Sequence, residues 1–124
     1  MTATGHVLVV EDDPNVLDIT SYVLELEGYD VLTAMNANEA LTTLADHPEV
    51  ELMLTDVNMP GDMDGIDLVR ELHRQGSAVS CVVVSGDALH ASDRLGKMNT
   101  SAAFLAKPYD RRSLLKAVSD AMAH

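Results

Sequence analysis

The stretch "ELMLTDVNMPGDMDGID", residues 51–67, ends an apolar run in a bare carboxylate. Leu52, Met53 and Leu54 form a continuous apolar segment that is typical of a buried strand, and Asp56 follows almost at once. An Asp at the end of a strand is by itself ordinary, because its side chain favours turns and loop starts. Whether Asp56 has a chemical role therefore depends on which polar residues follow the other strands.

The length and composition of the chain favour one globular domain. Its 124 residues are enough for a single core, and its apolar content is 47%. No linker, repeat or low-complexity stretch appears, so we interpret residues 1–124 as one domain without an appended effector domain. No signal peptide or membrane-spanning run is apparent. The only cysteine, Cys81, lies in the apolar run "CVVV", which predicts a buried thiol in a cytoplasmic protein.

The charge of the chain is divided unequally between its two halves. Residues 1–69 contain 15 Asp or Glu and no Lys or Arg, whereas residues 70–124 contain 5 acidic and 8 basic residues. Such an acidic chain is not expected to bind nucleic acid, because phosphate contacts need clustered cations. A solubilising surface is the simpler explanation of the acidic half. The alternative is that the two halves present different partner surfaces.

Five short apolar runs alternate with five segments of helical periodicity. Strands are predicted at residues 6–10, 29–34, 52–55, 81–84 and 103–106. Helices are predicted at about 14–27, from Asn36 or Asn38 to Asp46, from about Ile66 to Gln75, at about 88–98, and around Leu114, Leu115, Val118 and Met122. This alternation indicates an α/β fold with a parallel sheet and helices on both of its faces.

The first predicted helix carries recognisable end signals. Asp13 is a plausible N-cap, Pro14 suits the first turn, and Gly28 closes the helix. Its periodic apolar positions are Val16, Ile19, Val23, Leu24 and Leu26. These signals place the residues before Pro14 directly at the end of the first strand.

Polar side chains follow four of the predicted strands. Strand one is followed by Glu11, Asp12 and Asp13, strand three by Asp56, strand four by Ser85, and strand five by Lys107 and Pro108. In open parallel sheets, ligands bind outside the carboxyl ends of the strands, so these groups should converge on one edge. Asp56 is therefore expected to lie close to these other polar side chains.

The residue types in this set suit phosphoryl chemistry. Packed carboxylates repel each other unless a cation intervenes, and Mg²⁺ accepts a few oxygen ligands together with waters. Lys107 would act as a point charge for phosphate, and Ser85 would donate a hydrogen bond to a phosphoryl oxygen. Asp56 would be the nucleophile, because a carboxylate can form an acyl phosphate. The cations would neutralise the charge that spreads during in-line transfer.

The segments "VLVVEDDP", "LTDVNMPGDMDGIDLV", "VVVSGD" and "FLAKPY" occur in the order and spacing of a known family. With them the chain resembles, over nearly its whole length, the receiver domain of bacterial two-component response regulators. The resemblance implies a doubly wound, flavodoxin-like fold with strand order 2-1-3-4-5. It also implies that the domain is a signalling module and not an enzyme, apart from its own phosphorylation and dephosphorylation.

The resemblance assigns roles to individual residues. Asp56 would accept a phosphoryl group from a histidine kinase or histidine phosphotransfer protein. Mg²⁺, or Mn²⁺, would be held by Glu11, Asp12, Asp56 and the backbone carbonyl of Asn58. Asp13 falls one place later. We interpret it first as a helix cap and only second as a metal ligand.

Further positions match the family's switch. Ser85 matches the switch hydroxyl, Lys107 the phosphate-binding lysine, Pro108 the residue after a typically cis peptide bond, and Phe104 the aromatic that moves inward on activation. Phosphorylation would then rearrange the surface of helix four, strand five and helix five, which would bind an output protein or a second copy of the chain. That surface would carry Arg94, Lys97, Arg111, Arg112 and Lys116. The face around helix one has no basic residue, and we expect the phosphodonor to dock there.

Each assignment has a simpler alternative. Phe104 could be a static core residue, Ser85 a turn residue, and Lys107 a solvated loop lysine. The loop "MPGDMDG" is one residue longer than the frequent form, and Asn99 replaces the usual Gly before strand five, which leaves the shape of helix four open.

Two other functions compete with a phosphorylation switch. A Mg²⁺-dependent phosphohydrolase resembling the haloacid dehalogenase family would need a D-x-D-x-[TV] motif after the first strand, but the candidate nucleophile follows strand three. A degenerate receiver would only bind a partner, but the complete set of acidic residues, Ser85 and Lys107 argues against it.

Overall fold

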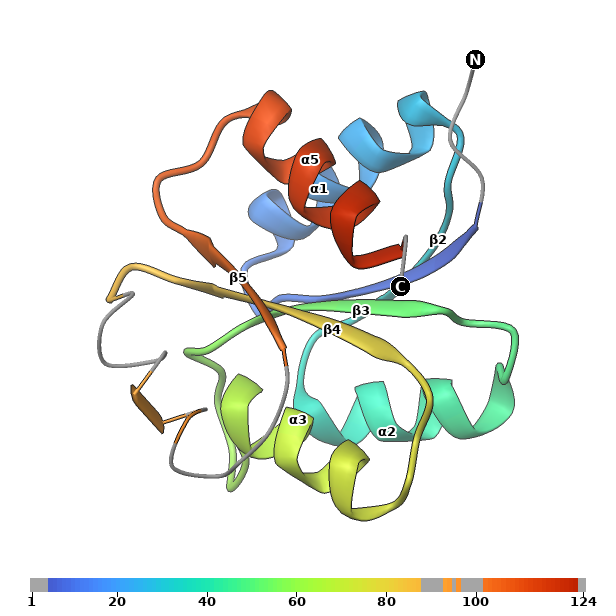
Figure 1. Ribbon diagram of the computed structural model, residues 1–124, viewed down its shortest axis with the longest axis vertical. Helices are drawn as coiled ribbons and strands as arrows, with labels where there is room; N and C mark the ends of the chain where they lie inside the picture. The colour runs from blue at the N-terminus through green and yellow to red at the C-terminus, as the bar shows by residue number, and fades with distance from the viewer. Residues whose placement is uncertain (1–4, 88–92, 95, 97–101, 123–124) are drawn as a thin grey trace.

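A central parallel sheet organises the computed structural model, which describes residues 5–87, 93, 94, 96 and 102–122. The five strands have the order β2-β1-β3-β4-β5 (Figure 1). They are β1 (His6–Val10), β2 (Asp30–Ala34), β3 (Leu52–Asp56), β4 (Ser80–Ser85) and β5 (Ala103–Ala106). The predicted doubly wound α/β fold and its strand order are therefore confirmed.

Helices cover both faces of the sheet. The helices are α1 (Pro14–Glu27), α2 (Ala37–Asp46), α3 (Gly65–Arg74) and α5 (Arg111–Met122). Figure 1 shows α1 and α5 on one face and α2 and α3 on the other. The helix predicted at 88–98 lies largely outside the described residues, although Asp93, Arg94 and Gly96 are helical. Within the described part of the chain, no helix is long and apolar enough to cross a membrane.

The two faces of the sheet bury two separate apolar clusters. Along β1, Leu8 and Val10 pack in the cluster under α2 and α3, whereas Val7 and Val9 pack in the cluster under α1 and α5. Successive side chains of a strand point to opposite faces, so a strand covered on both faces must be apolar throughout. This explains why the strands appear in the sequence as continuous apolar runs.

The helix ends follow the predicted local signals. Asp13 caps α1 by accepting a hydrogen bond from the Asn15 amide at 2.9 Å, and Gly28 ends that helix with a left-handed φ of 113°. Of the two asparagines considered for α2, Asn36 is the cap and accepts from the Glu39 amide at 2.9 Å.

The strands β3 and β4 end one residue later than predicted, β4 also begins one residue earlier, and β2 begins one residue later. Asp56 and Ser85 are the last residues of β3 and β4, where the sequence placed them just after the strands. Because both remain in the sheet, their backbones are held by pairing with neighbouring strands. The second strand begins at Asp30 and not at residue 29.

Not every periodic apolar position of α1 is buried. Leu24 is completely buried, whereas Ile19 and Leu26 are 66% and 58% exposed. The inner face of the helix instead includes Thr20 and Ser21. Periodicity located the helix correctly, but it did not identify all of the residues that face the core.

We expect Leu24→Ala to lower the free energy of unfolding by about 2–5 kcal/mol, because it leaves a cavity beneath α1. Leu26→Ala is the matched control on the same helix, and its effect should stay within about 0.5 kcal/mol. Urea denaturation of both variants measures the difference. Equal losses would contradict the assignment of Leu24 to the core.

Cys81 is buried, as the sequence predicted, and burial raises the pKa of its thiol to about 11. Since the thiolate is the reactive form, we expect the native protein to react with a disulfide reagent at pH 8 far more slowly than the urea-unfolded chain. Rapid modification of the native protein, measured by absorbance, would show that this part of β4 is accessible.

Candidate functional site

Parallel pairing gathers the strand ends at one edge of the sheet. Val10 lies opposite Thr55 in the register, Asp56 opposite Val84, and Ser85 opposite Ala106. The residues that end or follow these strands are therefore neighbours. In addition, the Lys107 amide donates a hydrogen bond to the Ser85 carbonyl at 2.8 Å, which places Lys107 beside β4. The Lys107–Pro108 peptide bond is cis.

Asp56 is buried and held at both carboxylate oxygens. The Lys107 ammonium (Nζ) lies 2.6 Å from Asp56 Oδ2, and the Asn58 amide donates to Oδ1 at 3.0 Å. The Asp56 side chain is only 6% exposed. Burial alone would lower the pKa of Lys107, but the hydrogen bond and charge of Asp56 outweigh it and raise that pKa above its usual value. Lys107 therefore stays charged beside Asp56.

Glu11 is the second buried carboxyl group at this edge. Burial raises its pKa to about 7, the neighbouring charge of Asp56 adds to this, and the hydrogen bond from the Asp13 amide partly opposes it. Asp12, the other member of the predicted acidic pair, is exposed. The two adjacent acids thus occupy different environments, because successive residues leaving a strand point in opposite directions.

The donor set fits a hard cation only in part. Among residues 5–87, 93, 94, 96 and 102–122, no three His, Cys, Asp or Glu side chains form a group that could hold a metal ion. Glu11 and Asp56 nevertheless place two buried carboxyl groups together, and the pKa of Glu11 is raised mainly by burial, with a smaller contribution from the charge of Asp56. A site completed by the Asn58 carbonyl and waters is compatible with the oxygen ligands and incomplete protein shell that Mg²⁺ prefers.

The predicted switch residues lie on β4 and β5. Ser85 is buried, and its Oγ accepts a hydrogen bond from the Asp87 amide at 2.9 Å, which leaves the hydroxyl proton available for another acceptor. Phe104 is half-buried and packs against the cluster under α2 and α3. The next residue, Leu105, belongs to the cluster on the other face of the sheet.

Gly65 is a site residue that the sequence did not single out. Its amide donates to the Val57 carbonyl at 2.9 Å, and a Cβ at this position would collide with the carbonyl oxygen of Asp56. The first turn of α3 therefore rests directly on the backbone of Asp56. A glycine is needed for this close approach, and a Gly at the first position of a helix, next to a strong N-cap, was the available signal.

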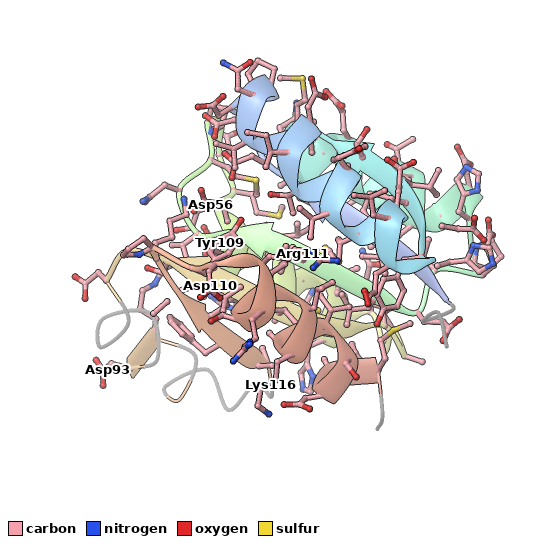
Figure 2. The ribbon with its side chains drawn as sticks, turned by 90° about the horizontal axis from the view of Figure 1, so that it is seen from above. Asp56, Asp93, Tyr109, Asp110, Arg111 and Lys116 are labelled. Atoms are coloured by element: carbon pink, nitrogen blue, oxygen red, sulfur yellow. The ribbon has the colours of Figure 1, made fainter. Side chains whose placement is uncertain are left out.

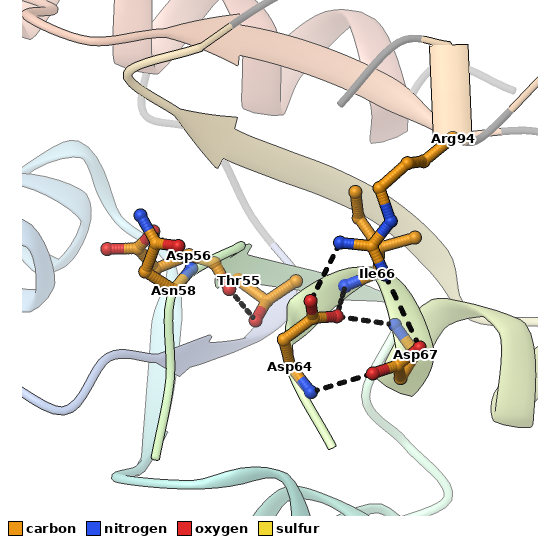
Figure 3. Close-up of polar contacts among 7 residues, drawn as sticks. All are labelled: Thr55, Asp56, Asn58, Asp64, Ile66, Asp67 and Arg94. Atoms are coloured by element: carbon orange, nitrogen blue, oxygen red, sulfur yellow. Dashed lines mark hydrogen bonds and ion pairs between the residues drawn. The ribbon is translucent and has the colours of Figure 1, made fainter. Parts of the chain in front are cut away.

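Arg94 lies against the N-terminus of α3 (Figure 3). Its guanidinium contacts Asp64 Oδ2 at 2.8 Å and Asp67 Oδ1 at 3.4 Å. Burial would raise the pKa of Asp64, but the hydrogen bond from Arg94 and those involving Asp67 hold it below its usual value. Arg94 was predicted to belong to a basic output surface, which stays a prediction, and its charge is paired within the chain with Asp64 and Asp67.

Tyr109 was also missed by the sequence. Its hydroxyl lies 3.2 Å from Thr20 Oγ1 on α1, and Tyr109 lines a small cavity together with Glu11 and Asp56. Figure 2 shows Tyr109 beside Asp56, Arg111 pointing toward α1, and Lys116 pointing outward. Tyr109 thus closes the site on the side of α1 and α5.

Comparison with known proteins identifies the family. Residues 7–119 match the family model of the response regulator receiver domain. The chain therefore belongs to the response regulator receiver domain family. Members of this family are receiver domains of two-component response regulators, typically non-catalytic signalling modules that bind Mg²⁺ and have a cognate histidine kinase.

Individual relatives agree with this assignment. The chain is 36% identical over 119 residues to the transcriptional regulatory protein AruR of Pseudomonas aeruginosa, covering 93% of this chain and 48% of that protein. It is 30% identical over 118 residues to the transcriptional regulatory protein GlrR of Escherichia coli, covering 95% of this chain and 26% of that protein. The chain thus spans less than half the length of these relatives.

Solved structures show the same fold. A CheY-like receiver domain protein from Methanospirillum hungatei is 31% identical, with a TM-score of 0.83 and coverage of 98% of this chain and 95% of that one. A sensor protein from Polaromonas sp. is 30% identical, with a TM-score of 0.86 and coverage of 96% of both chains.

We expect Gly65→Ala to lower the free energy of unfolding by about 1–3 kcal/mol, because the new methyl group must displace the Asp56 backbone. Gly86→Ala is the control, since the space around Gly86 is open, and it should change stability by at most about 0.5 kcal/mol. Urea unfolding of the two variants measures this. A neutral Gly65→Ala would show that α3 does not press on Asp56.

Proposed function

We propose that Asp56 accepts a phosphoryl group from a histidine kinase or histidine phosphotransfer protein, and that its phosphorylation switches a protein-binding surface. The observation that carries this proposal is the buried Asp56 carboxylate, held between the Lys107 ammonium at 2.6 Å and the Asn58 amide at 3.0 Å. These contacts orient a nucleophile and supply a cation where phosphoryl charge would develop.

In the proposed reaction, a carboxylate oxygen of Asp56 attacks the phosphorus atom of the donor's phosphohistidine. The P–O bond forms as the P–N bond breaks, and the electron pair of the P–N bond returns to the imidazole. The product is an acyl phosphate on Asp56. The Lys107 ammonium would balance the charge on the transferred group, and the Ser85 hydroxyl would donate a hydrogen bond to one of its oxygens.

We assign the metal site to Glu11, Asp12, Asp56 and the backbone carbonyl of Asn58. Mg²⁺ or Mn²⁺ bound there would supply charge neutralisation at the phosphoryl oxygens. Binding would also require Glu11 to lose its proton, so the cation and the proton would compete for this carboxyl group. Asp13 remains the cap of α1.

The switch would run from the site to β5 and α5. Movement of Ser85 toward the phosphoryl group would open space for Phe104, and the surface of helix four, β5 and α5 would rearrange. On α5 this surface carries the exposed residues Arg111, Arg112 and Lys116, whereas Lys97 lies outside the described residues. We propose that it binds an output protein or a second copy of the chain, in the cytoplasm and without nucleic acid or membrane.

The phosphodonor would dock on the acidic face around α1. We further propose that residues 1–124 act as one receiver unit whose output is contact with another protein. The family assignment supports signalling over the alternative of a phosphohydrolase, since receiver domains are typically non-catalytic.

The decisive test is intact-protein mass spectrometry after incubation with Mg²⁺ and acetyl phosphate. We expect one phosphoryl adduct on the wild type and none on Asp56→Asn. Asp62→Asn, a change of an exposed residue in the same loop, is the matched control and should be modified like the wild type. An adduct that persists on Asp56→Asn would place the phosphoacceptor elsewhere. A wild type that no donor modifies, including a histidine kinase, would favour a receiver that only binds its partner.

A further inference from the structure

One arginine connects two elements that border the site. Arg94 follows β4 in the chain, and its guanidinium donates to Asp64 at 2.8 Å and to Asp67 at 3.4 Å (Figure 3). The side chains of Arg94 and Asp64 are 30% and 28% exposed, so the contact is partly shielded from water. A planar guanidinium that reaches two carboxylates fixes their geometry as well as their charge.

The same two carboxylates form the N-terminal cap of α3. Asp64 Oδ1 accepts hydrogen bonds from the amides of Ile66 at 3.0 Å and Asp67 at 2.9 Å. Asp67 Oδ2 accepts in turn from the Asp64 amide at 3.1 Å. Each carboxylate therefore uses one oxygen for the cap and the other for Arg94, so the arginine completes the hydrogen bonding of the capping box.

The capped first turn of α3 contacts the backbone of Asp56, the proposed phosphoacceptor. Gly65 lies between the two capping carboxylates in the chain, its amide donates to the Val57 carbonyl at 2.9 Å, and it leaves no room for a side chain against the Asp56 carbonyl. The Asn58 amide, which orients the Asp56 carboxylate, belongs to the loop between this contact and the cap. A displaced first turn of α3 would therefore disturb the loop that orients Asp56.

We propose that Arg94 is a positioning residue for Asp56. Through Asp64 and Asp67 it holds the first turn of α3, and with it the loop that carries Asn58, against the end of β3. It contacts none of the reacting atoms. That this positioning serves phosphorylation rests on the proposed function. The positioning itself is present in the unphosphorylated protein.

Amide hydrogen exchange in the metal-free, unphosphorylated protein tests the proposal. We expect Arg94→Ala to raise the exchange rates of the Ile66, Asp67 and Asn58 amides by about tenfold. Arg74→Ala is the matched control, because Arg74 also pairs with an acid of α3, Glu71 at 2.6 Å, but lies at the other end of the helix. It should leave the three amides unchanged.

Further variants separate positioning from general stability. Exchange of core amides in β1 and β3 reports any global loss, and Arg94→Lys, which keeps the charge without the planar fork, should fall between wild type and Arg94→Ala. In a double-mutant cycle, Asp67→Asn should cause little further increase in the exchange rates of these amides when Arg94 is already replaced by Ala. If only Ile66 and Asp67 exchange faster while Asn58 is unchanged, Arg94 is only part of the helix cap, and the proposal is overturned.

The chemical readout is the rate at which acetyl phosphate modifies each variant. This small donor needs no docking surface, so a loss of about tenfold in Arg94→Ala, with Arg74→Ala unchanged, would locate the effect at the site. An unchanged rate in Arg94→Ala would overturn the positioning role. A wild type that is never phosphorylated would count against the proposed function alone, since the exchange experiments still decide the role of Arg94.

Discussion

The ion pair between Lys107 and Asp56 is the contact on which the rest of the site depends. A carboxylate as buried as that of Asp56, whose side chain is 6% exposed, is costly unless a cation and hydrogen bonds accompany it. Its partner stands 51 residues away in the chain and arrives only because β5 pairs with β4. The pairing of β5 with β4 is therefore what brings the Lys107 ammonium to the Asp56 carboxylate, which links the fold directly to the site.

The site keeps an excess of negative charge that the fold does not fully relieve. Glu11 lies beside Asp56, and burial raises its pKa to about 7 even though Lys107 is close. Groups held away from their usual pKa are typical of functional sites, because stability alone would not favour them. A cation or a cationic partner would relieve this repulsion. The same carboxyl groups would supply oxygen ligands for the metal ion that we propose.

Local signals in the sequence predicted the elements well. The cap at Asp13, the left-handed Gly28 and the apolar strands all depend on residues within a few positions of one another, and the structure contains each of them. The contacts that were missed join distant segments. Arg94 reaches Asp64 across 30 positions, and Gly65 approaches Asp56 only because α3 packs on the end of β3. The periodicity of apolar residues in a sequence does not indicate contacts between such distant segments.

By itself, the sequence determined which elements form, in which order, and which polar residues stand at the strand ends. Those features follow from backbone propensity and short-range periodicity, which the chain carries locally. Only the tertiary structure decided that Glu11 is buried and Asp12 exposed, that the charge of Arg94 is engaged by α3, and that Ile19 and Leu26 face outward. Burial and ion pairing depend on which strands and helices become neighbours, and parallel pairing brings together segments that are far apart in the chain.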